Sequence, residues 1–561
     1  MSSEALLYEP TKYQENISLH EVVSPTPDGV INNLIQMYGN EQGYYLDTIR
    51  RLGESYRTQA ELLCERFNLA QQSALEMARN ILHENLTWRP WDIHSSHERH
   101  RGITAVTAPG LFVSVFGESP LKKIYTSGPT TLIDTVNGTE LFIDALTNAT
   151  VNNNGSHPSI ALAASVAPMM TGGTYCLAYH DGPLVEQASI ALKGLHPMYN
   201  DQAKVWWGND GGSASAFAVH LAEKATNAIK GENPNRKAVA FKEAYHGNVQ
   251  NKGGDLTTGI GSTGLNHIIE FPDINSEVGQ AMQELTCMVN RDEVSTIILE
   301  ATQGDGGGVQ LHPDFFIEMM KLAQDNQIPI IFDEIQSGFG RSGRVFNYEY
   351  LLEEYQRSEL VKSHGYPEHP HNIITIVGKS MTDGCATGSA VIFNNYYTKF
   401  NGRAEGVATY AAFPSTLAAA ISTTKMINPQ YLDMARANRV SFDEGLSPYL
   451  SEVVMQSRGN GCHLFVEIGG DELLYRNGKP VGNHEIAQVL LAERFRILTG
   501  TVARNGLRVH LPVNAHPLVW RAVGKAVGVV GESIKNGDVG ELAPILLQQV
   551  SGLADRSVTE I

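Results

Sequence analysis

The sequence predicts an α/β fold with a large domain built on a mainly parallel central sheet, beside a smaller α+β domain. From about residue 106 onward, short and almost wholly apolar runs alternate with longer stretches of helical periodicity. This alternation is typical of parallel strands covered by helices on both faces. After about residue 430 the pattern changes to strands and helices in mixed order, which indicates the second, smaller unit.

The elements of the large domain follow from hydrophobic periodicity. We expect strands at residues 204–207, 237–241, 296–299, 329–332 and 373–377. We expect helices between them at 214–230, 276–289, 313–326 and 415–426. In the smaller domain, residues 462–468 and 506–511 are predicted strands.

Changes of pattern suggest four segments. Residues 1–105 form a helical N-terminal extension, with apolar residues at helical spacing from Gln59 to Leu82. Residues 106–160 are the N-terminal part of the small domain, 161–428 the large domain and 429–561 the C-terminal small domain. Within the large domain, residues 347–371 are rich in Glu, His and Pro, and we expect this insertion to lie on the surface.

Composition excludes several classes of protein. The net charge of −18 argues against binding to a nucleic-acid backbone, which needs clustered Lys and Arg. No run approaches the ~18 apolar residues of a membrane span, and the start MSSEALLYEP lacks the features of a secretory signal. The five cysteines are scattered without a CxxC pair, which favours a reducing compartment and no metal site. We therefore expect a cytoplasmic protein without nucleic-acid or membrane partners.

Two segments carry the strongest chemical signal. The strand 329–332 ends on Asp333, ahead of a glycine-rich turn, and Lys379 follows the strand 373–377 and Gly378. In open parallel sheets, ligands bind beyond the carboxyl ends of the strands. An acidic and an amine-bearing side chain are therefore expected to enter the same crevice.

The segment PIIFDEIQSGFGRSGRVF, residues 329–346, resembles the active-site signature of the class III aminotransferases (the ornithine, acetylornithine, GABA and ω-amino acid type). These are pyridoxal 5′-phosphate (PLP) enzymes of the PLP-dependent transferase fold type I. Further matches follow in the family's order between about Leu132 and Pro512. They lie at residues 131–140, 155–158, 245–247, 300–305 and 458–461.

The resemblance implies roles for Lys379, Asp333 and Gln336 in holding PLP. Lys379 would form a Schiff base with the cofactor and, once displaced, move the proton between substrate and cofactor. Asp333 would pair with the pyridine nitrogen, which must stay protonated for the cofactor to act as an electron sink. Gln336 would donate a hydrogen bond to the ring hydroxyl. Residues 161–428 would then be the PLP-binding domain.

The remaining cofactor contacts are also implied by the family. Gly211 and Gly212 resemble its phosphate-binding turn at a helix start, although Asp210 stands where a serine is usual. Thr409 matches a threonine that reaches the phosphate from the partner subunit of a homodimer, but Ala-Ala-Phe follows Tyr410 where Gly-Gly-Asn is usual. Tyr245 matches the aromatic residue stacked on the cofactor ring.

Substrate contacts are implied for two residues. Arg508 matches the arginine that grips a substrate carboxylate, and Asp305 matches the acidic residue that holds this arginine aside. The family more often has glutamate at the Asp305 position. Glu300 falls on a family position near the cofactor.

The function implied is transfer of an amino group from an amine or amino acid donor to a keto acid, aldehyde or ketone acceptor by ping-pong chemistry. A PLP-dependent racemase, epimerase or aminomutase of the same fold is the alternative, and it would need no second substrate. A catalytically silent scaffold, with residues 1–105 as an interaction module, is a third reading. The joint retention of Asp333, Gln336, Lys379 and Arg508 argues against it.

Overall fold

The computed structural model describes residues 124–128, 131–134, 140–155, 157–170, 182–197, 202–247, 266–401, 410–471, 473–476 and 479–539. The chain divides into two units, Met1–Ala108 and Pro109–Ile561, and every described residue belongs to the second. The predicted N-terminal extension and its helix therefore lie outside the described residues.

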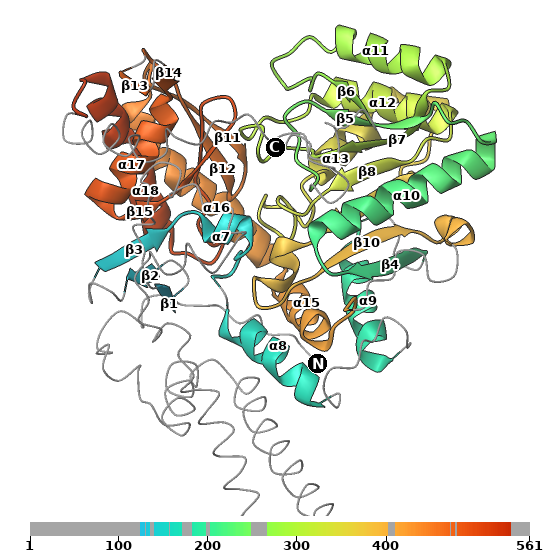
Figure 1. Cartoon of the computed structure of the whole chain (residues 1–561), viewed down its shortest axis with the longest axis horizontal. Coiled ribbons are helices and arrows are strands. Elements are labelled where there is room, and N and C mark those ends of the chain that lie inside the picture. The colour runs from blue at the N-terminus through green and yellow to red at the C-terminus, as the bar shows by residue number, and fades with distance from the viewer. Residues whose placement is uncertain are drawn as a thin grey trace, which may run out of the picture. The chain divides into compact units, whose positions relative to one another are not determined.

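A seven-stranded sheet forms the centre of the large domain, in the order β4-β10-β9-β8-β7-β5-β6 (Figure 1). The strands are β4 (Ala203–Gly208), β5 (Lys237–Phe241), β6 (Asn266–Ile269), β7 (Val294–Leu299), β8 (Ile330–Asp333), β9 (Ile373–Val377) and β10 (Ser389–Asn394). Strand β10 is antiparallel to both of its neighbours, β4 and β9, and all other strand pairs in this sheet are parallel. The mainly parallel sheet and its five predicted strands are confirmed, whereas β6 and β10 were not predicted.

Both faces of this sheet are buried, as the near-continuous apolar strands require. In β8, Ile330 and Phe332 join one hydrophobic cluster, while Ile331 between them joins a second cluster on the opposite face. Helix α10 (Gly211–Lys230) covers the second face. The first face is covered by α11 (Gly279–Asn290) and α12 (Pro313–Asp325). The four predicted helices are present within three residues of their expected ends.

The insertion at residues 347–371 lies only partly on the surface, which corrects our expectation. It forms α13 (Glu349–Arg357) and α14 (Glu359–His364). In α13, the side chains of Leu351, Leu352 and Tyr355 are buried in the core beside α12. The cause is a local apolar stripe on α13 that the charged and Pro-rich composition of the whole segment concealed. Of the two helices in this insertion, only α14 has no buried residue.

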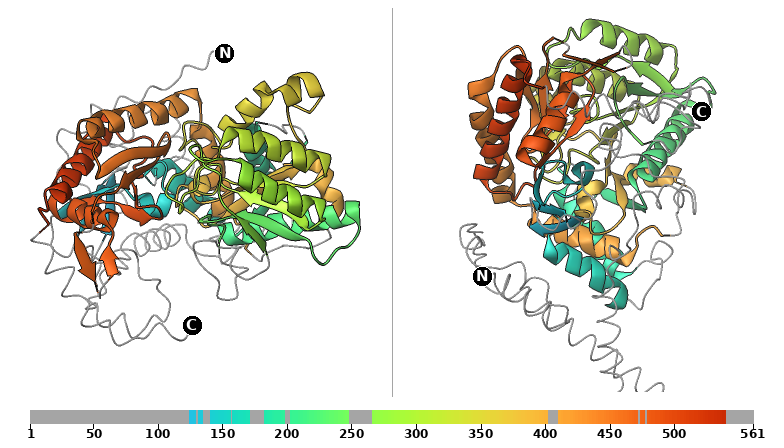
Figure 2. Two further views of the ribbon diagram at one scale, coloured as in Figure 1. Left: turned by 90° about the horizontal axis from the view of Figure 1, so that it is seen from above. Right: turned by 60° about the vertical axis from the view of Figure 1, so that its left-hand side comes forward.

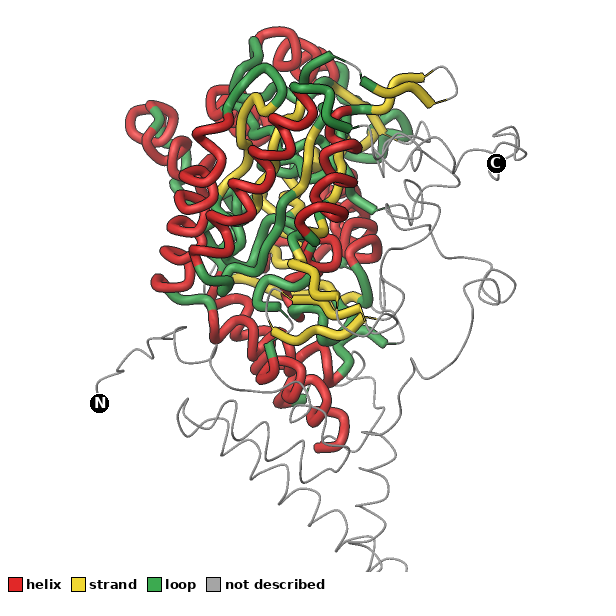
Figure 3. The backbone as a smooth tube through the Cα atoms, turned by 90° about the vertical axis from the view of Figure 1, so that its left-hand side faces the viewer, coloured by secondary structure: helices red, strands yellow, loops and turns green. Residues whose placement is uncertain are grey.

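The C-terminal segment forms a second layered unit. Its sheet has the order β11-β12-β17-β16, with β11 (Val454–Asn460), β12 (His463–Ile468), β16 (Gly500–Val502) and β17 (Gly506–Arg508). Helices α16 (Pro429–Leu446), α17 (Asn483–Phe495) and α18 (Pro517–Lys535) share its core, and Figure 3 shows helices beside these strands. Helices α16 and α18 can approach closely because Gly445 and Gly524 lack a Cβ, which would otherwise meet the backbone of the other helix.

Residues from the two halves of the sequence share one further sheet, β1-β2-β3-β15. It contains β1 (Ile124–Gly128), β2 (Thr131–Asp134), β3 (Glu140–Asp144) and β15 (Ile497–Leu498). Parallel pairing of Ile143 with Ile497 joins the early strands to the C-terminal unit, and Figures 1 and 2 show them side by side. Two other strands, β13 (Leu474–Arg476) and β14 (Lys479–Val481), form a hairpin.

The remaining helices connect these sheets. They are α7 (Thr147–Thr150), α8 (Pro158–Met170), α9 (Pro183–Leu195), α15 (Pro414–Met426) and the 3₁₀ turns at Lys379–Thr382, Asn395–Phe400 and Ser447–Tyr449. Helices α8 and α9 both pack on α15. No helix in the described ranges is long and apolar enough to cross a membrane.

Arg341 joins the large domain to the C-terminal unit. Its guanidinium is fully buried and donates to Asn153 Oδ1 at 2.6 Å and to the carbonyls of Cys462 and Leu511, each at 3.2 Å. Burial lowers the pKa of Arg341 from its usual value. Three acceptors from three distant segments therefore depend on one side chain.

We predict that Arg341→Leu lowers the free energy of unfolding by about 3 kcal/mol, because each buried acceptor left without a donor costs about 1–3 kcal/mol. The matched control is Arg357→Leu, since Arg357 is 63% exposed and forms only surface ion pairs with Glu353 and Glu354. Such pairs contribute about 0–1 kcal/mol. Urea denaturation of both variants checks the difference. Equal losses of stability would contradict the assignment.

Candidate active site

Three adjacent parallel strands bring distant acidic and basic residues to one edge of the sheet. Strands β7, β8 and β9 pair in register, so that Leu299 lies opposite Phe332 and Asp333 lies opposite Ile376. Glu300 directly follows β7, Asp333 ends β8, and Lys379 comes two residues after β9. Their side chains therefore gather at the carboxyl edge, where parallel sheets bind ligands.

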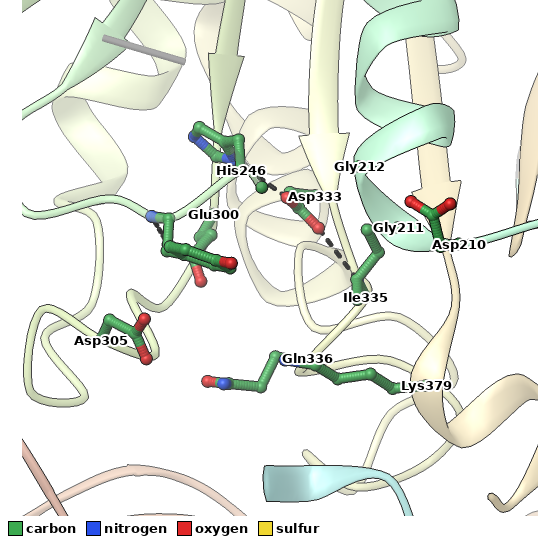
Figure 4. A pocket seen from close by; sticks show the side chains of 12 residues that line it. Asp210, Gly211, Gly212, His246, Glu300, Asp305, Asp333, Ile335, Gln336 and Lys379 are labelled. Carbon is green, nitrogen blue, oxygen red and sulfur yellow. Dashed lines mark hydrogen bonds and ion pairs between the residues drawn. The ribbon is translucent and has the colours of Figure 1, made fainter. Parts of the chain in front are cut away.

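A pocket of about 260 Å³ opens at this edge (Figure 4). It is lined by Asp210, Gly211, Gly212, Tyr245, His246, Gly247, Glu300, Asp305, Asp333, Ile335, Gln336 and Lys379. Eight of the ten residues singled out from the sequence are among them: Gly211, Gly212, Tyr245, Glu300, Asp305, Asp333, Gln336 and Lys379. The structure therefore brings these eight residues together in one pocket.

Lys379 has a strained backbone conformation and a buried amine. Its φ of 41° falls in the left-handed region, which non-glycine residues rarely adopt and which is often found at functional sites. Burial of its amine lowers the pKa from the usual value, and nearby Arg508 lowers it further. The amine is therefore neutral, and hence nucleophilic, at a lower pH than that of an exposed lysine.

Asp333 is held in place from two directions. Its Oδ1 accepts a hydrogen bond from the Ile335 backbone N–H at 3.0 Å, and its Oδ2 accepts one from His246 Nδ1 at 2.8 Å (Figure 4). Both Asp333 and His246 are buried. His246 Nε2 is also buried and has no hydrogen-bond partner among the described residues. The hydrogen bond from His246 therefore fixes the orientation of the Asp333 carboxylate at the pocket.

Glu300 organises two loops around the pocket. One oxygen accepts from the Tyr245 backbone N–H at 3.2 Å, and the other accepts from the Gly304 N–H at 3.1 Å. Burial raises the pKa of Glu300 to about 7, against the lowering influence of His246. This carboxyl therefore positions the segment that carries Tyr245, which is half-buried at the pocket wall.

Glycines form one wall of the pocket because side chains would not fit there. Gly247 has a φ of +81°, and a Cβ on it would lie 2.9 Å from the Cα of Gly212. A Cβ on Gly211 would lie 2.8 Å from Ile335. The start of α10 therefore presents bare backbone to the pocket, as anion-binding helix ends do.

Asp210 caps this helix. Its Oδ1 accepts from the Ser213 backbone N–H at 2.9 Å, and Ser213 Oγ accepts from the Asp210 N–H at 3.2 Å. The reciprocal pair is a capping box that satisfies N–H groups at the helix end. The acidic side chain that departs from the family pattern thus has a local structural role.

Gln336 connects the pocket to the C-terminal unit. Its Oε1 lies 3.2 Å from Nε2 of His463, whose ring is 5.1 Å from that of His510. Burial lowers the pKa of both histidines well below the usual value, so both are neutral near pH 7. A neutral His463 that donates to Oε1 leaves the amide N–H₂ of Gln336 as the group free to face a ligand.

Arg508 and Asp305 form an ion pair at 2.5 Å. Arg508 is largely buried beside the pocket, whereas Asp305 lines the pocket itself. Nε of Arg508 has no hydrogen-bond partner among the described residues. The predicted partnership of these two residues is present in the geometry. Thr409 lies outside the described residues.

Sequence reasoning missed His246, Ile335 and Gly247 as pocket residues. His246 and Gly247 lie in the matched segment 245–247, but only Tyr245 was given a role there; a histidine five residues after the end of β5, at the carboxyl edge of the sheet, was a usable signal. Ile335 was hidden by its apolar character, which is ordinary near a strand end. The apolar branch of Ile335 and the ring of Tyr245 both line the pocket, so a flat aromatic ligand would meet apolar surface there.

These residues fit PLP. The pocket offers an amine of lowered pKa, a fixed carboxylate, bare backbone at a helix N-terminus and an aromatic wall. An aldehyde, a ring nitrogen, a phosphate and an aromatic ring are the chemical counterparts of those groups.

Comparison with known proteins agrees with this geometry. Residues 117–475 match the family model described as aminotransferase class-III. The chain is 26% identical over 328 residues to an acetylornithine aminotransferase of Lactococcus lactis, covering 55% of this chain and 77% of that protein. It is 28% identical over 346 residues to an acetylornithine aminotransferase of Halalkalibacterium halodurans, covering 60% and 79%.

Solved structures show the same fold. A transaminase from the marine bacterium Virgibacillus has a TM-score of 0.63 at 18% identity, covering 78% of this chain and 98% of that one. The ornithine aminotransferase of Toxoplasma gondii has a TM-score of 0.60 at 19% identity, covering 79% and 99%. The predicted PLP-dependent transferase fold type I is thereby confirmed. With more than half of its length matched by the family model, this chain belongs to the class III aminotransferases, PLP-dependent enzymes that transfer amino groups.

Proposed function

We propose that this aminotransferase takes its amino group from a donor that also carries a carboxylate, and that Lys379 and Asp333 are its catalytic residues. The observation that carries the proposal is the meeting of a buried amine and a fixed carboxylate in one pocket, beside the Arg508–Asp305 pair. PLP, when bound, supplies an aldehyde and an electron-withdrawing ring. The chain's own residues hold, orient and move protons around it.

Lys379 is proposed to attach the cofactor and then to carry a proton. Its lowered pKa supports both roles, because the amine loses its proton at a lower pH than an exposed lysine and can then act as a nucleophile and afterwards as a general base. Asp333 is proposed to hold a proton on the ring nitrogen. A carboxylate ~4 Å away at an effective dielectric of ~20 favours that proton by ~4 kcal/mol before desolvation is counted. His246 keeps this carboxylate aimed at the pocket.

Arg508 is proposed to bind the donor's carboxylate. Asp305 is proposed to hold Arg508 aside, or to release it when the donor binds. The guanidinium can offer two parallel N–H groups to a carboxylate once it leaves Asp305. Relatives of this chain are named acetylornithine aminotransferases, and similar structures are named ornithine aminotransferases. We therefore propose a donor of the ornithine or N-acylated ornithine type, with a keto acid as acceptor.

The remaining pocket residues are proposed to contact other parts of the cofactor. Gly211 and Gly212 are proposed to bind the phosphate, Tyr245 to stack on the ring and Gln336 to donate to the ring hydroxyl. Glu300 is proposed to position the loop of Tyr245, as its two backbone hydrogen bonds favour.

A homodimer with shared sites, completed by Thr409 of the second subunit, is part of the proposal. In the single chain, the aromatic side chain of Tyr410 beside Thr409 is 65% exposed, which favours a contact surface there. A cytoplasmic location is also proposed. The described cysteines Cys287, Cys385 and Cys462 are all free, which favours a reducing compartment.

Lys379→Ala should abolish the absorption band of lysine-bound PLP and lower turnover by at least about a hundredfold, because both the attachment point and the proton carrier are lost. Absorbance and amino-transfer assays measure the two effects. Lys399→Ala, on the outside of the same domain, is the control. Undiminished turnover in Lys379→Ala would remove the assignment. One equivalent of keto product per amine donor supports transfer, whereas conversion without an acceptor would favour a racemase or mutase.

The pH at which PLP attaches tests the lowered pKa of Lys379. A group with a lowered pKa loses its proton at lower pH, so attachment should reach half its maximum at a lower pH on the chain than on Nα-acetyl-lysine. Borohydride fixes the attached PLP, and peptide mass spectrometry quantifies it. PLP is common to both reactions, so titration of its phosphate cancels. Equal midpoints would contradict the effect of burial.

Arg508→Leu should raise KM for a carboxylate-bearing donor by about 10- to 100-fold, since hydrogen bonds to charged groups contribute about 1.5–3 kcal/mol. KM for a simple alkylamine, which lacks a carboxylate, should change little. Steady-state kinetics with both donors provides the comparison, and Arg521→Leu, 59% exposed on α18, is the control. An equal rise in KM for both donors would show that Arg508 has only a structural role.

A further inference from the structure

The lining of the pocket has more acidic than basic side chains, although the proposed cofactor carries a negative phosphate. Its lining carries four carboxyl groups, those of Asp210, Glu300, Asp305 and Asp333. Lys379 is the only Lys or Arg among the described lining residues. Asp333 faces a ring nitrogen in the proposed function, Asp305 is paired with Arg508, and Glu300 accepts from the backbone N–H groups of Tyr245 and Gly304. Asp210 remains, at the start of the proposed phosphate turn.

Asp210 already occupies part of that turn. The positive end of α10 lies at Gly211 and Gly212, where backbone N–H groups and the helix dipole attract anions. The carboxylate of Asp210 accepts one of those N–H groups, from Ser213 at 2.9 Å, and is fixed there by the reciprocal contact. In Figure 4 it lies at the start of α10, beside Gly211.

The segment that follows β5 packs against this turn and brings a buried imidazole to the pocket lining. Gly247 packs directly on Gly212, where no side chain fits. His246 is 1% exposed, and its Nε2 faces no partner among the described residues. A phosphate bound at this turn and the carboxylate of Asp210 would both be attracted to the positive N-terminal end of α10.

We propose that Asp210 determines how strongly the phosphate of the cofactor contributes to binding. Its negative charge competes for the N-terminus of α10 and repels the phosphate, so the chain distinguishes PLP from unphosphorylated pyridoxal less than it would with a neutral cap. This inference rests on the proposed function of the pocket. Its consequence is a cofactor that exchanges more readily with the free pool.

The size of the effect is limited by solvent. Asp210 is exposed, so water and salt screen its charge. We expect removal of the charge to tighten PLP binding by about threefold to tenfold, where tenfold corresponds to about 1.4 kcal/mol. Binding of pyridoxal, which has no phosphate, should remain unchanged.

The variant Asp210→Asn removes the negative charge and keeps the helix cap, so it separates the effect of charge from an effect on folding. Asparagine is as good an N-cap as aspartate, and its amide oxygen can still accept from Ser213 N–H. Equilibrium dialysis of the full-length apoenzyme gives dissociation constants for PLP and for pyridoxal. Glu232→Gln is the matched control, since Glu232 is exposed just beyond the far end of α10, about 30 Å away at 1.5 Å per residue, and loses the same charge.

The expected result is a threefold to tenfold rise in the preference for PLP over pyridoxal in Asp210→Asn and none in Glu232→Gln. An unchanged or reduced preference in Asp210→Asn overturns the inference, as does an equal rise in both variants. If the unaltered chain binds PLP but Asp210→Asn has no effect, this inference alone fails. If the unaltered chain binds neither compound, the proposed function fails with it.

Discussion

The parallel pairing of β7, β8 and β9 is the constraint on which the rest of the site depends. Because the three strands run in one direction, the residues that follow them meet at a single edge, although Glu300 and Lys379 are far apart in the sequence. Strand β5 joins the same parallel set and delivers Tyr245 and His246 to that edge. Among the described residues, those that line the pocket all lie at or shortly after the end of a strand.

Burial then gives these side chains their chemistry. The pocket removes water from Lys379 and Glu300, which lowers the pKa of the amine and raises that of the carboxyl to about 7. Desolvation of this kind is costly, and positive φ at Lys379 adds strain. The cost is offset by the buried cores on both faces of the sheet, so a rigid scaffold maintains a reactive site that its local sequence would not favour.

The sequence predicted those parts of the molecule that have local signals. Apolar runs gave β5, β7, β8 and β9, and residues at strand ends gave Asp333 and Lys379. Strand β10 was missed although it is an apolar, fully buried run like the predicted strands, and its antiparallel direction leaves no local signal in the sequence. The contact of His246 with Asp333 spans 87 positions, and that of His463 with Gln336 spans 127, so neither leaves a local trace. The partly buried insertion shows that composition alone does not determine exposure, because one apolar stripe is enough to bury one face of a charged helix.

The most direct measurement of the central claim is a crystal structure of the full chain with PLP bound. We predict continuous density from Nζ of Lys379 into the cofactor, with the Asp333 carboxylate about 3 Å from the pyridine nitrogen on the other side of the ring. Density that joins PLP to a different lysine, or that leaves the carboxylate of Asp333 out of contact with the cofactor, would contradict the claim that these two residues share one catalytic site.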